Sequence, residues 1–533
     1  MPGGGKKDIT PPKVVKYTPD SAQLNFNAKA IQINFDEFIQ LKDLNSQLII
    51  SPPLKTTPEI TVKGKSLNIV FDRKDTLKSN TTYCISFGNA VQDITENNPI
   101  DNFKYIFSTG SFIDSCTVKG KVQNGFNHTV EKGILVMLYS NFDDSIIYKH
   151  LPDYFAKTKD DGTFQINNVK EGKYKLMVLK DGNANYKYDG EAESLGFIET
   201  PIDVTKKGNI LIDIFQETPK KLYLKKNTYD SYGKIVFVFN KGADSLQINP
   251  INYTFKEGDV LLHYSKNKDS LTYWFRNIDK DVLKLQLKNG YRILDTLEYK
   301  LITKEEALKS RKNKLAFTLI NNFNGNQAFD LNGEMKLIFN HTIERIGDDN
   351  LYIKKMGDEI VLKEDTLIMK HIFQTNYSLP DKENIVAPFS VKFKESTKYH
   401  LFIPPGTFTD FFGLTNDTIK IDFKTQEEKF YGTVKLKINI PEAKGQYILQ
   451  LLDDKENLFR ETIINAEQTI NYDYLHPQQY KLKLIYDDNK NGKWDTGNYL
   501  QKIQPEKVIY YTGTVTIRSN WDLDLEWKVT TDK

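Results

Sequence analysis

The sequence lacks several features that mark particular classes of protein. It has two cysteines, Cys84 and Cys116, which are too few for a disulfide framework and match no zinc-binding spacing. No stretch approaches the roughly 18 consecutive apolar residues of a membrane-spanning helix. The 73 basic residues nearly balance the 70 acidic ones, giving a net charge of +3. This balance argues against nucleic acid as a partner.

Motifs of enzyme active sites are missing as well. The seven His residues form no H-E-x-x-H pair, no G-x-S-x-G elbow occurs, and the Gly64-Lys65-Ser66 turn lacks the first Gly of a P-loop. Carboxylates are numerous, but nothing in the sequence singles out a pair as general acid and base. We therefore expect a protein that is not an enzyme and requires no cofactor.

Aromatic residues and short alternating runs are what the chain has in abundance. It contains 32 Phe and 29 Tyr, residue types that favour strands. Apolar and polar residues alternate in 30–35, 234–239 and 481–486, as in half-buried strands. The one helical pattern, 303–314, suits a linker between modules. The sequence thus predicts an all-β protein built of β-sandwiches.

One pattern of residues occurs twice. Residues 82–93 and 398–410 each contain a strand, a turn and an Asp-centred loop, and each is followed by a strand that closes on Phe-x-Thr. Together with the opening 8–19, this pattern resembles the SbsA-type bacterial Ig-like domain of S-layer and cell-surface proteins. The resemblance implies Ig-like domains at 1–110, leader included, and 311–427. The segment 218–310 resembles a further, divergent Ig-like sandwich.

The two copies of a second repeat match each other more closely. Residues 172–189 and 479–495 share an apolar strand followed by a D-x-N-x-N-x-K-aromatic-D run, position by position. With Asp161-Gly162-Thr163-Phe164 upstream, the first copy resembles the carboxypeptidase-regulatory or transthyretin-like β-sandwich, over 111–217. The second copy, 428–533, lacks the Asp-Gly-x-Phe element. The fold expected is an extended chain of five tandem sandwiches, Ig-like and transthyretin-like.

This domain order resembles a group of Bacteroidota surface or periplasmic Ig-like lipoproteins. In their precursors a lipid-modified Cys precedes a Gly-rich leader like Gly3 to Asp8. The resemblance implies a cell-envelope protein on either face of the outer membrane, exported by a signal peptide absent here and attached only by an N-terminal lipid. It also implies other envelope proteins as partners, in the role of a scaffold or accessory subunit of an outer-membrane complex.

The loop of the second transthyretin-like copy is a candidate metal site. Asp487, Asn489, Asn491 and Gly492 fit positions 1, 3, 5 and 6 of a D-x-[DN]-x-[DN]-G calcium loop, and Asp495 falls at position 9. Position 12 is an Asn instead of the bidentate Glu. The alternative is an Asx-rich turn without metal, and the sequence leaves the two open. Any Ca²⁺ bound here would be structural.

The first copy offers a less complete version of the same loop. Asp181, Asn183, Asn185 and Asp189 are present, but Tyr186 stands where the calcium pattern has Gly. We expect a turn here in preference to a Ca²⁺ site.

An alternative function is glycan capture. Trp274 and Trp494 are candidate platforms for sugar rings, although aromatic residues of this kind more often belong to a core or anchor a loop.

Overall fold

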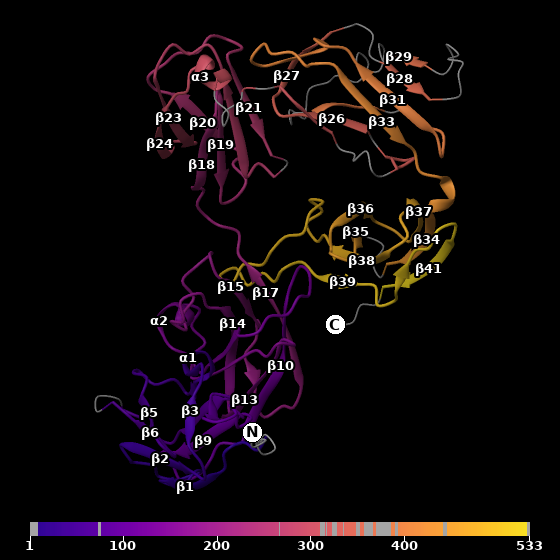
Figure 1. The fold of residues 1–533 in the computed structure, drawn as a ribbon. Helices are drawn as coiled ribbons and strands as arrows, with labels where there is room; N and C mark the ends of the chain where they lie inside the picture. The colour runs from indigo at the N-terminus through magenta and orange to yellow at the C-terminus, as the bar shows by residue number, and fades with distance from the viewer. Residues whose placement is uncertain are drawn as a thin grey trace, which may run out of the picture. The chain divides into compact units, whose positions relative to one another are not determined.

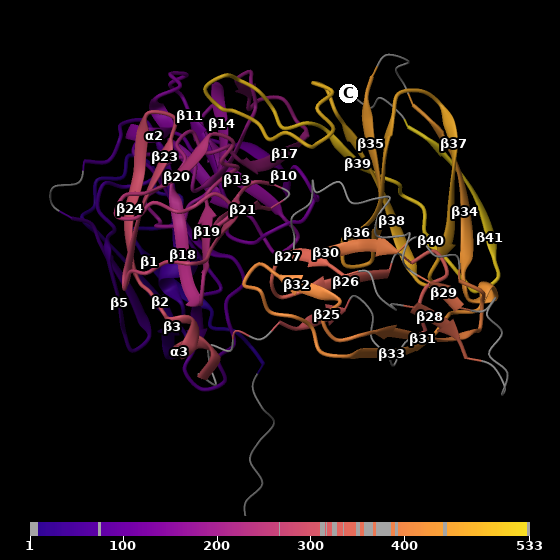
Figure 2. The same cartoon turned by 90° about the horizontal axis from the view of Figure 1, so that it is seen from above.

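The computed structural model describes residues 9–72, 76–265, 267–309, 315, 317–321, 328–333, 335–347, 352–356, 366–368, 385–389, 393–440 and 445–529. Strands dominate all of these segments (Figures 1 and 2), so the all-β class and the tandem sandwiches are confirmed. The chain forms two compact units. Unit 1 contains Met1–Thr218 and Ile485–Ile509, and unit 2 contains Pro219–Leu484 and Tyr510–Lys533. Within the described part, no helix is long and apolar enough to cross a membrane.

The first sandwich encloses a core of alternate strand residues. In β2 (Ala30–Phe35) every second side chain is buried, beginning with Ile31. Its sheets have the orders β1-β2-β6-β5, β4-β7-β9 and β3-β8. The other elements are β1 (Val14–Thr18), β3 (Ile39–Leu41), α1 (Leu44–Gln47), β4 (Ile49–Ser51), β5 (Glu59–Lys63), β6 (Ser66–Val70), β7 (Thr82–Gly88), β8 (Val91–Asp93) and β9 (Phe103–Ser108).

The second sandwich has the strand order β12-β11-β14-β15-β17-β10-β13, with β16 beside β14. Its first and last strands, β10 and β17, run parallel, and the other pairs are antiparallel. The elements are β10 (Cys116–Asn124), β11 (Leu135–Tyr139), α2 (Ile146–Lys149), β12 (Tyr154–Lys157), β13 (Thr163–Val169), β14 (Lys173–Lys180), β15 (Ser194–Phe197), β16 (Ile202–Asp203) and β17 (Asn209–Gln216). Cys84 in β7 and Cys116 in β10 are free thiols.

The third sandwich pairs a four-stranded sheet, β18-β19-β22-β21, with a three-stranded sheet, β20-β23-β24. Its elements are β18 (Leu224–Ser231), β19 (Lys234–Phe239), β20 (Leu246–Pro250), β21 (Val260–Tyr264), β22 (Ser270–Phe275), β23 (Val282–Asn289) and β24 (Arg292–Lys300). The helix predicted at 303–314 appears as α3 (Lys304–Lys309), and the rest of that prediction lies outside the described residues.

The fourth sandwich has the strand orders β25-β26-β30, β27-β32 and β29-β28-β31-β33. Its strands are β25 (Leu319–Asn321), β26 (Met335–Phe339), β27 (Ile343–Ile346), β28 (Tyr352–Lys355), β29 (Thr366–Ile368), β30 (Ile385–Phe389), β31 (Lys398–Ile403), β32 (Phe408–Asp410) and β33 (Ile419–Lys424).

The predicted repeat of the first sandwich in the fourth is visible in their hydrogen bonds. Thr109 and Thr425 each accept a backbone N–H from the residue 28 positions earlier, at 3.0 Å. Each also donates to a carbonyl 31 positions earlier, at 2.7 and 2.6 Å. The buried Asp93 and Asp410 each accept backbone N–H groups of the loop that follows. The two copies therefore share side-chain chemistry as well as pattern.

The fifth sandwich repeats the topology of the second. Its parallel pair is β34 with β41, and the sheets have the orders β37-β34-β41 and β36-β35-β38-β39, with β40 also beside β38. The elements are a 3-10 turn (Glu428–Phe430), β34 (Gly432–Asn439), β35 (Tyr447–Asp453), β36 (Leu458–Ile464), β37 (Gln468–Leu475), β38 (Gln479–Tyr486), β39 (Val508–Tyr510), β40 (Val515–Thr516) and β41 (Asp522–Lys528). The likeness extends beyond the short run that revealed it in the sequence.

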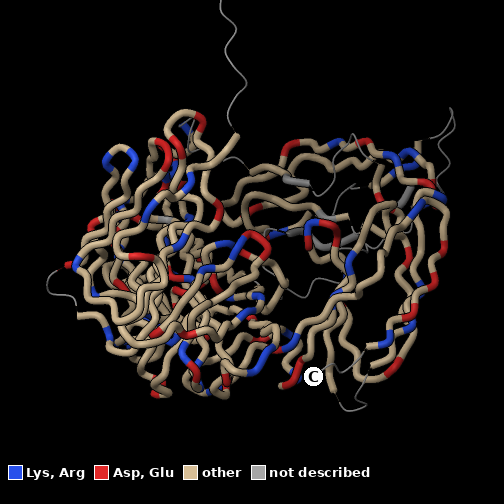
Figure 3. Tube along the Cα trace, turned by 90° about the horizontal axis from the view of Figure 1, so that it is seen from below, with Lys and Arg blue, Asp and Glu red and all other residues tan. Residues whose placement is uncertain are grey.

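Charged residues of both signs are interspersed along the chain. Figure 3 shows Lys and Arg scattered among Asp and Glu along a trace that consists mostly of other residues. Mixed surfaces of this kind keep a chain of near-zero net charge from presenting a field of one sign.

Candidate functional site

The loop after β38 brings together the four side chains predicted there. Asp487 is 1% exposed, and its carboxylate accepts the backbone N–H groups of Asn491 at 3.0 Å and Gly492 at 2.8 Å. The side-chain amides of Asn489 and Asn491 both donate to Asp495 Oδ2, at 2.5 Å. Gly492 has a φ of +77°, the left-handed conformation that a calcium loop requires at its sixth position.

The loop after β14 has the same arrangement. Asp181 accepts the N–H groups of Asn183 at 3.1 Å and Tyr186 at 2.8 Å. The amides of Asn183 and Asn185 donate to Asp189 Oδ2, at 2.6 and 2.8 Å. Tyr186 has a φ of +61°, which costs more for Tyr than for the Gly of the other copy.

Each loop is closed by a glutamate that the sequence analysis missed. Glu193 accepts the N–H of Asp189 at 2.9 Å, and Glu506 accepts the N–H of Asp495 at 2.9 Å. A second oxygen of each carboxylate accepts the N–H of the loop's second residue. Burial raises the pKa of Glu506, and these two hydrogen bonds oppose the shift. Both glutamates lie one or two residues before the next strand, and this is the position that the two copies share.

The loop at 487–495 has the donor set for a hard cation. Turning each Asn amide by 180° about its last torsion exchanges nitrogen and oxygen in place, which would aim both Asn oxygens at the Asp495 carboxylate. Ca²⁺ accepts carboxylate and amide oxygens of this kind. No group of three or more His, Cys, Asp or Glu side chains forms a metal site in the described residues, so Ca²⁺ here would depend on the Asn oxygens. Calcium binding stays a prediction.

The loop of the second copy also makes a contact that the sequence did not predict. The loop between β14 and β15 is 181–193, whereas the loop between β38 and β39 is the longer 487–507. Its residues 494–504, here called the strap, lie on the second sandwich beside β15 and β17 (Figures 1 and 2). Sequence reasoning placed this segment only within the fifth domain, because no local pattern marks a contact with residues nearly 300 positions away.

Tyr499 is the centre of the strap. Its side chain is fully buried, and its ring meets Phe197 edge-on with centroids 5.4 Å apart. Its backbone N–H donates to Glu217 Oε1 at 2.7 Å, and its hydroxyl donates to the carbonyl of Asp144 at 3.1 Å. The other oxygen of Glu217 accepts the Tyr188 hydroxyl at 2.8 Å. The strap is therefore held by a buried aromatic ring and by a buried carboxylate with two partners.

Charged side chains lie at the edge of the contact between the strap and the second sandwich. Asp144 forms ion pairs with both Lys175 and Lys502, and the Lys502 ammonium lies 4.4 Å from the centre of the Tyr499 ring. Burial alone would raise the pKa of Asp144, but hydrogen bonds from the two lysines bring it below its ordinary value. The carboxylate thus stays ionised at neutral pH.

The two ends of the strap fit closely as well. Trp494 packs against Phe126 with ring centroids 5.0 Å apart, and its Nε1–H donates to the carbonyl of Glu506 at 2.9 Å. Gly497 approaches the Phe215 ring so closely that a Cβ would lie 2.6 Å from it. Trp494 is a loop anchor, not an exposed platform for sugar rings.

Trp274 is also unavailable to a ligand. It is 1% exposed and belongs to a cluster with Ala307, Phe411 and Phe412. The Lys234 ammonium lies 4.9 Å from its ring centre. The structure therefore makes Trp274 a core residue, the commoner of the two roles considered for it.

Two His–Asp pairs have structural surroundings, whereas a third, His476 with Asp330 at 2.7 Å, is partly exposed. His341 Nδ1 lies 2.7 Å from Asp410 Oδ2, but both side chains are buried, and the ring meets Phe412 edge-on at 5.2 Å. His400 pairs with Asp422, its cross-strand neighbour in β33. These contacts join strands and do not open onto a cavity for a substrate.

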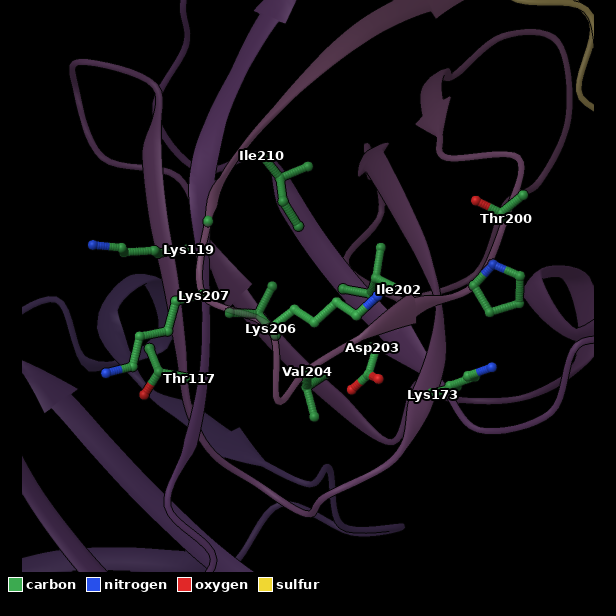
Figure 4. Close-up of a pocket in the computed structure, with 13 residues that line it drawn as sticks. Thr117, Lys119, Lys173, Thr200, Ile202, Asp203, Val204, Lys206, Lys207 and Ile210 are labelled. Carbon is green, nitrogen blue, oxygen red and sulfur yellow. The ribbon is translucent and has the colours of Figure 1, made fainter.

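The second sandwich also contains a cavity of about 460 Å³ with a basic rim (Figure 4). It lies between the start of β10, the start of β14, β16 and the turn that leads into β17. Its charged lining residues are Lys119, Lys173, Lys206, Lys207 and Asp203. The sequence analysis did not find it, because its lysines come from three separate segments.

Comparison with known proteins identifies one domain of the chain. Residues 8–109 match the family model of the bacterial Ig-like domain, as the resemblance of the first sandwich predicted. A stretch of 107 residues is 29% identical to a probable rhamnogalacturonate lyase B of Aspergillus flavus, covering 20% of this chain. The match spans only 16% of that lyase.

Solved structures match long stretches of the chain at low TM-scores. The Bacillus anthracis TIE protein matches over 99% of this chain and 76% of its own, with 9% identity and a TM-score of 0.14. BcpA, the major pilin subunit of Bacillus cereus, matches over 78% of this chain and 99% of its own, with 7% identity and a TM-score of 0.15. The S-layer protein rSbsC matches over 94% and 66%, with 11% identity and a TM-score of 0.13. These values are too low to carry any likeness of function.

Proposed function

We propose that the chain is a non-enzymatic structural and interaction protein of the bacterial cell envelope. The bacterial Ig-like domain at 8–109 and the sandwiches that follow it support this role. The side chains that first suggested chemistry, those of the two Asp/Asn loops, make hydrogen bonds within their own loops. Function then lies in the surfaces that the sandwiches present.

The strap is the observation that carries the proposal. The chain leaves unit 1 after Thr218 and re-enters it at Ile485, where Tyr499 is fully buried. Residues 219–484 are thereby closed into a loop with both ends fixed in one unit. Such closure brings together two points of the chain that are far apart in the sequence, and it supports a structural role for the strap.

Attachment to the outer membrane is the finer part of the proposal. We infer an N-terminal lipid from the Gly-rich leader, with a scaffold or accessory role in an outer-membrane complex. The test is to express the native precursor in its own host with a clickable fatty acid, then fractionate the envelope. We expect the label on the protein and the protein with the outer membrane. An unlabelled protein in the periplasmic fraction would contradict the attachment.

The partner is tested separately by cross-linking intact cells and isolating the protein. We expect the same envelope proteins to be recovered from repeated preparations, and to be lost when Tyr499 is replaced by Ala if the strap organises the binding surface. Recovery of no envelope protein in cross-linked cells would contradict the scaffold role. Ca²⁺ in the 487–495 loop would be structural, fixing the segment from which the strap begins.

A further inference from the structure

We propose that the basic cavity of the second sandwich binds an acidic peptide segment of a partner protein, with an aliphatic side chain between its carboxylates. This inference rests on the proposed interaction role and names the chemistry of one partner. The cavity, of about 460 Å³, falls within the range of ligand-binding pockets. Its walls combine charge at the rim with an apolar floor.

The rim concentrates positive charge. Lys119, Lys173, Lys206 and Lys207 surround the single carboxylate of Asp203, which leaves three positive charges in excess. The whole chain of 533 residues carries a net charge of only +3. The cavity therefore stands out from a surface that is otherwise balanced, and an anionic ligand is favoured there.

These lysines differ from other lysines of the second sandwich in their charged partners. None of the four forms an ion pair in the part of the chain that the structure describes, whereas Lys175 and Lys180 of the same sandwich pair with Asp144 and Glu131. In the view of Figure 4, Lys206 extends across the opening, with Lys119 and Lys207 on one side and Lys173 on the other. The charges thus flank the opening, which suits a ligand with more than one carboxylate.

Asp203 adds a constraint on where those carboxylates sit. Its side chain accepts the backbone N–H of Thr205 at 3.0 Å and the Thr205 hydroxyl at 2.7 Å. These hydrogen bonds, helped by Lys206 and Lys173, lower the pKa of Asp203, so it is ionised at neutral pH. A fixed negative charge between the lysines repels an anion at the centre and directs ligand carboxylates to the two flanks.

The apolar residues at the base of the cavity favour a peptide ligand over an acidic sugar. It is formed by Val118, Ile202, Val204 and Ile210, and no aromatic side chain occurs among the lining residues. The lining offers no flat aromatic face on which a sugar ring could stack, whereas an aliphatic side chain fits a branched aliphatic floor. Lysine ammonium groups are mobile point charges, so we expect binding that is modest in affinity and sensitive to salt.

The test uses the full chain and a fluorescein-labelled peptide of sequence EEIEE, with fluorescence anisotropy read at low and physiological salt. We expect saturable binding that weakens with salt, and little binding of the neutral peptide QQIQQ or of EEGEE. The combined variant Lys119→Glu, Lys173→Glu and Lys206→Glu should weaken binding about tenfold or more. A matched variant at the exposed residues Lys221, Lys225 and Lys226, with the same change of charge, should change it less than about twofold.

Three results would overturn the proposal: no saturable binding at low salt, equal weakening by the two triple variants, or tighter binding of oligogalacturonate than of the peptide. Circular dichroism and melting curves of both variants establish that each is folded. Because this assay uses purified protein, its failure leaves envelope location and cross-linked partners to be judged by their own experiments.

Discussion

The backbone N–H of Tyr499 donates to Glu217 Oε1 over 2.7 Å, joining residues 282 positions apart in the sequence. Glu217 is 7% exposed and immediately follows β17, while Tyr499 lies at the tip of the strap. A buried carboxylate is costly unless it is paired, and Glu217 has two donors, this N–H and the Tyr188 hydroxyl. The contact therefore fixes the position of the strap on the second sandwich.

Replacing Tyr499 by Ala should release the strap. Loss of a fully buried aromatic ring typically costs about 3–5 kcal/mol, and this ring also shields the Glu217 hydrogen bond. We expect a lower free energy of unfolding in urea and faster amide exchange throughout 494–504. Tyr291→Ala, at a fully exposed position, is the control and should change stability by less than about 0.5 kcal/mol. Unchanged exchange in 494–504 would show that the strap does not depend on this residue.

Acid should loosen the strap through Asp144. Its pKa in the folded chain is below the unfolded value of about 3.9, because the hydrogen bonds from Lys175 and Lys502 outweigh burial. The stabilisation is therefore complete above the unfolded pKa and is lost as the pH falls through the folded pKa. We expect exchange protection factors of 494–504 to hold from pH 7 to about 5 and to fall below about pH 4.

Asp144→Asn provides the control for that titration. The variant keeps the side-chain shape but has no charge for either lysine, so its strap should already be less protected at pH 7. A variant with the same acid-dependent loss of protection as the native chain would mean that other carboxylates are responsible.

Local structure was predictable here because it depends on alternation. The patterns at 30–35, 234–239 and 481–486 correspond to β2, β19 and the greater part of β38. The repeats succeeded for a similar reason, since Asp93 and Asp410 hold equivalent loops through short-range hydrogen bonds that need the same residues at the same spacing. The four side chains of each Asp/Asn loop also converge as their spacing indicated.

Long-range contacts were not predictable in this way. Nothing in the residues around Tyr499 specifies Glu217 as a partner, because packing between distant segments depends on the shape of both surfaces. The basic cavity is similar, since its lysines are separated along the chain and meet only through the sheet. Glu193 and Glu506 lie at different distances after the Asp/Asn run, because the second loop is longer, so comparing the two copies position by position does not align them.

Calcium should bind the 487–495 loop more readily than the 181–189 loop. Gly492 has the left-handed backbone that Tyr186 adopts at greater cost, so the second loop is better preorganised. Tb³⁺, which takes the same oxygen ligands, should luminesce on excitation of Trp494 within the loop, and Ca²⁺ should displace it. If Ca²⁺ reaches about 100 times its dissociation constant, stability should rise by about 2.7 kcal/mol relative to chelator.

Matched amide variants separate the two loops. Asn491→Ala should abolish the Trp494-sensitised signal and the stabilisation by Ca²⁺, whereas Asn185→Ala should leave both nearly unchanged. These residues are preferred to Asp487, whose removal would leave buried N–H groups without acceptors. If Ca²⁺ has no effect on the melting temperature of the native chain, the loop is an Asx turn that needs no metal.

Lys483 should be destabilising at neutral pH, and its counterpart in the repeat shows what could replace it. The residue at the matching position of β14 is Met177, and both side chains are almost fully buried. Burial lowers the pKa of Lys483 to about 8, so at pH 7 the charged ammonium destabilises the folded chain. Below the folded pKa this cost is complete, and it diminishes as the pH rises toward the unfolded pKa of about 10.4.

We therefore expect Lys483→Met to stabilise the protein by about 1–3 kcal/mol at pH 7, with the gain shrinking toward pH 10. Urea unfolding of the native chain and the variant at both pH values measures this difference directly. Lys481→Met is the control: its side chain is 46% exposed and its ammonium pairs with Glu456 at 2.9 Å, so no such pH-dependent gain should appear. A variant less stable than the native chain at pH 7 would mean that the 5.9 Å contact of Lys483 with the Tyr510 ring, together with its other interactions, outweighs the cost of burial.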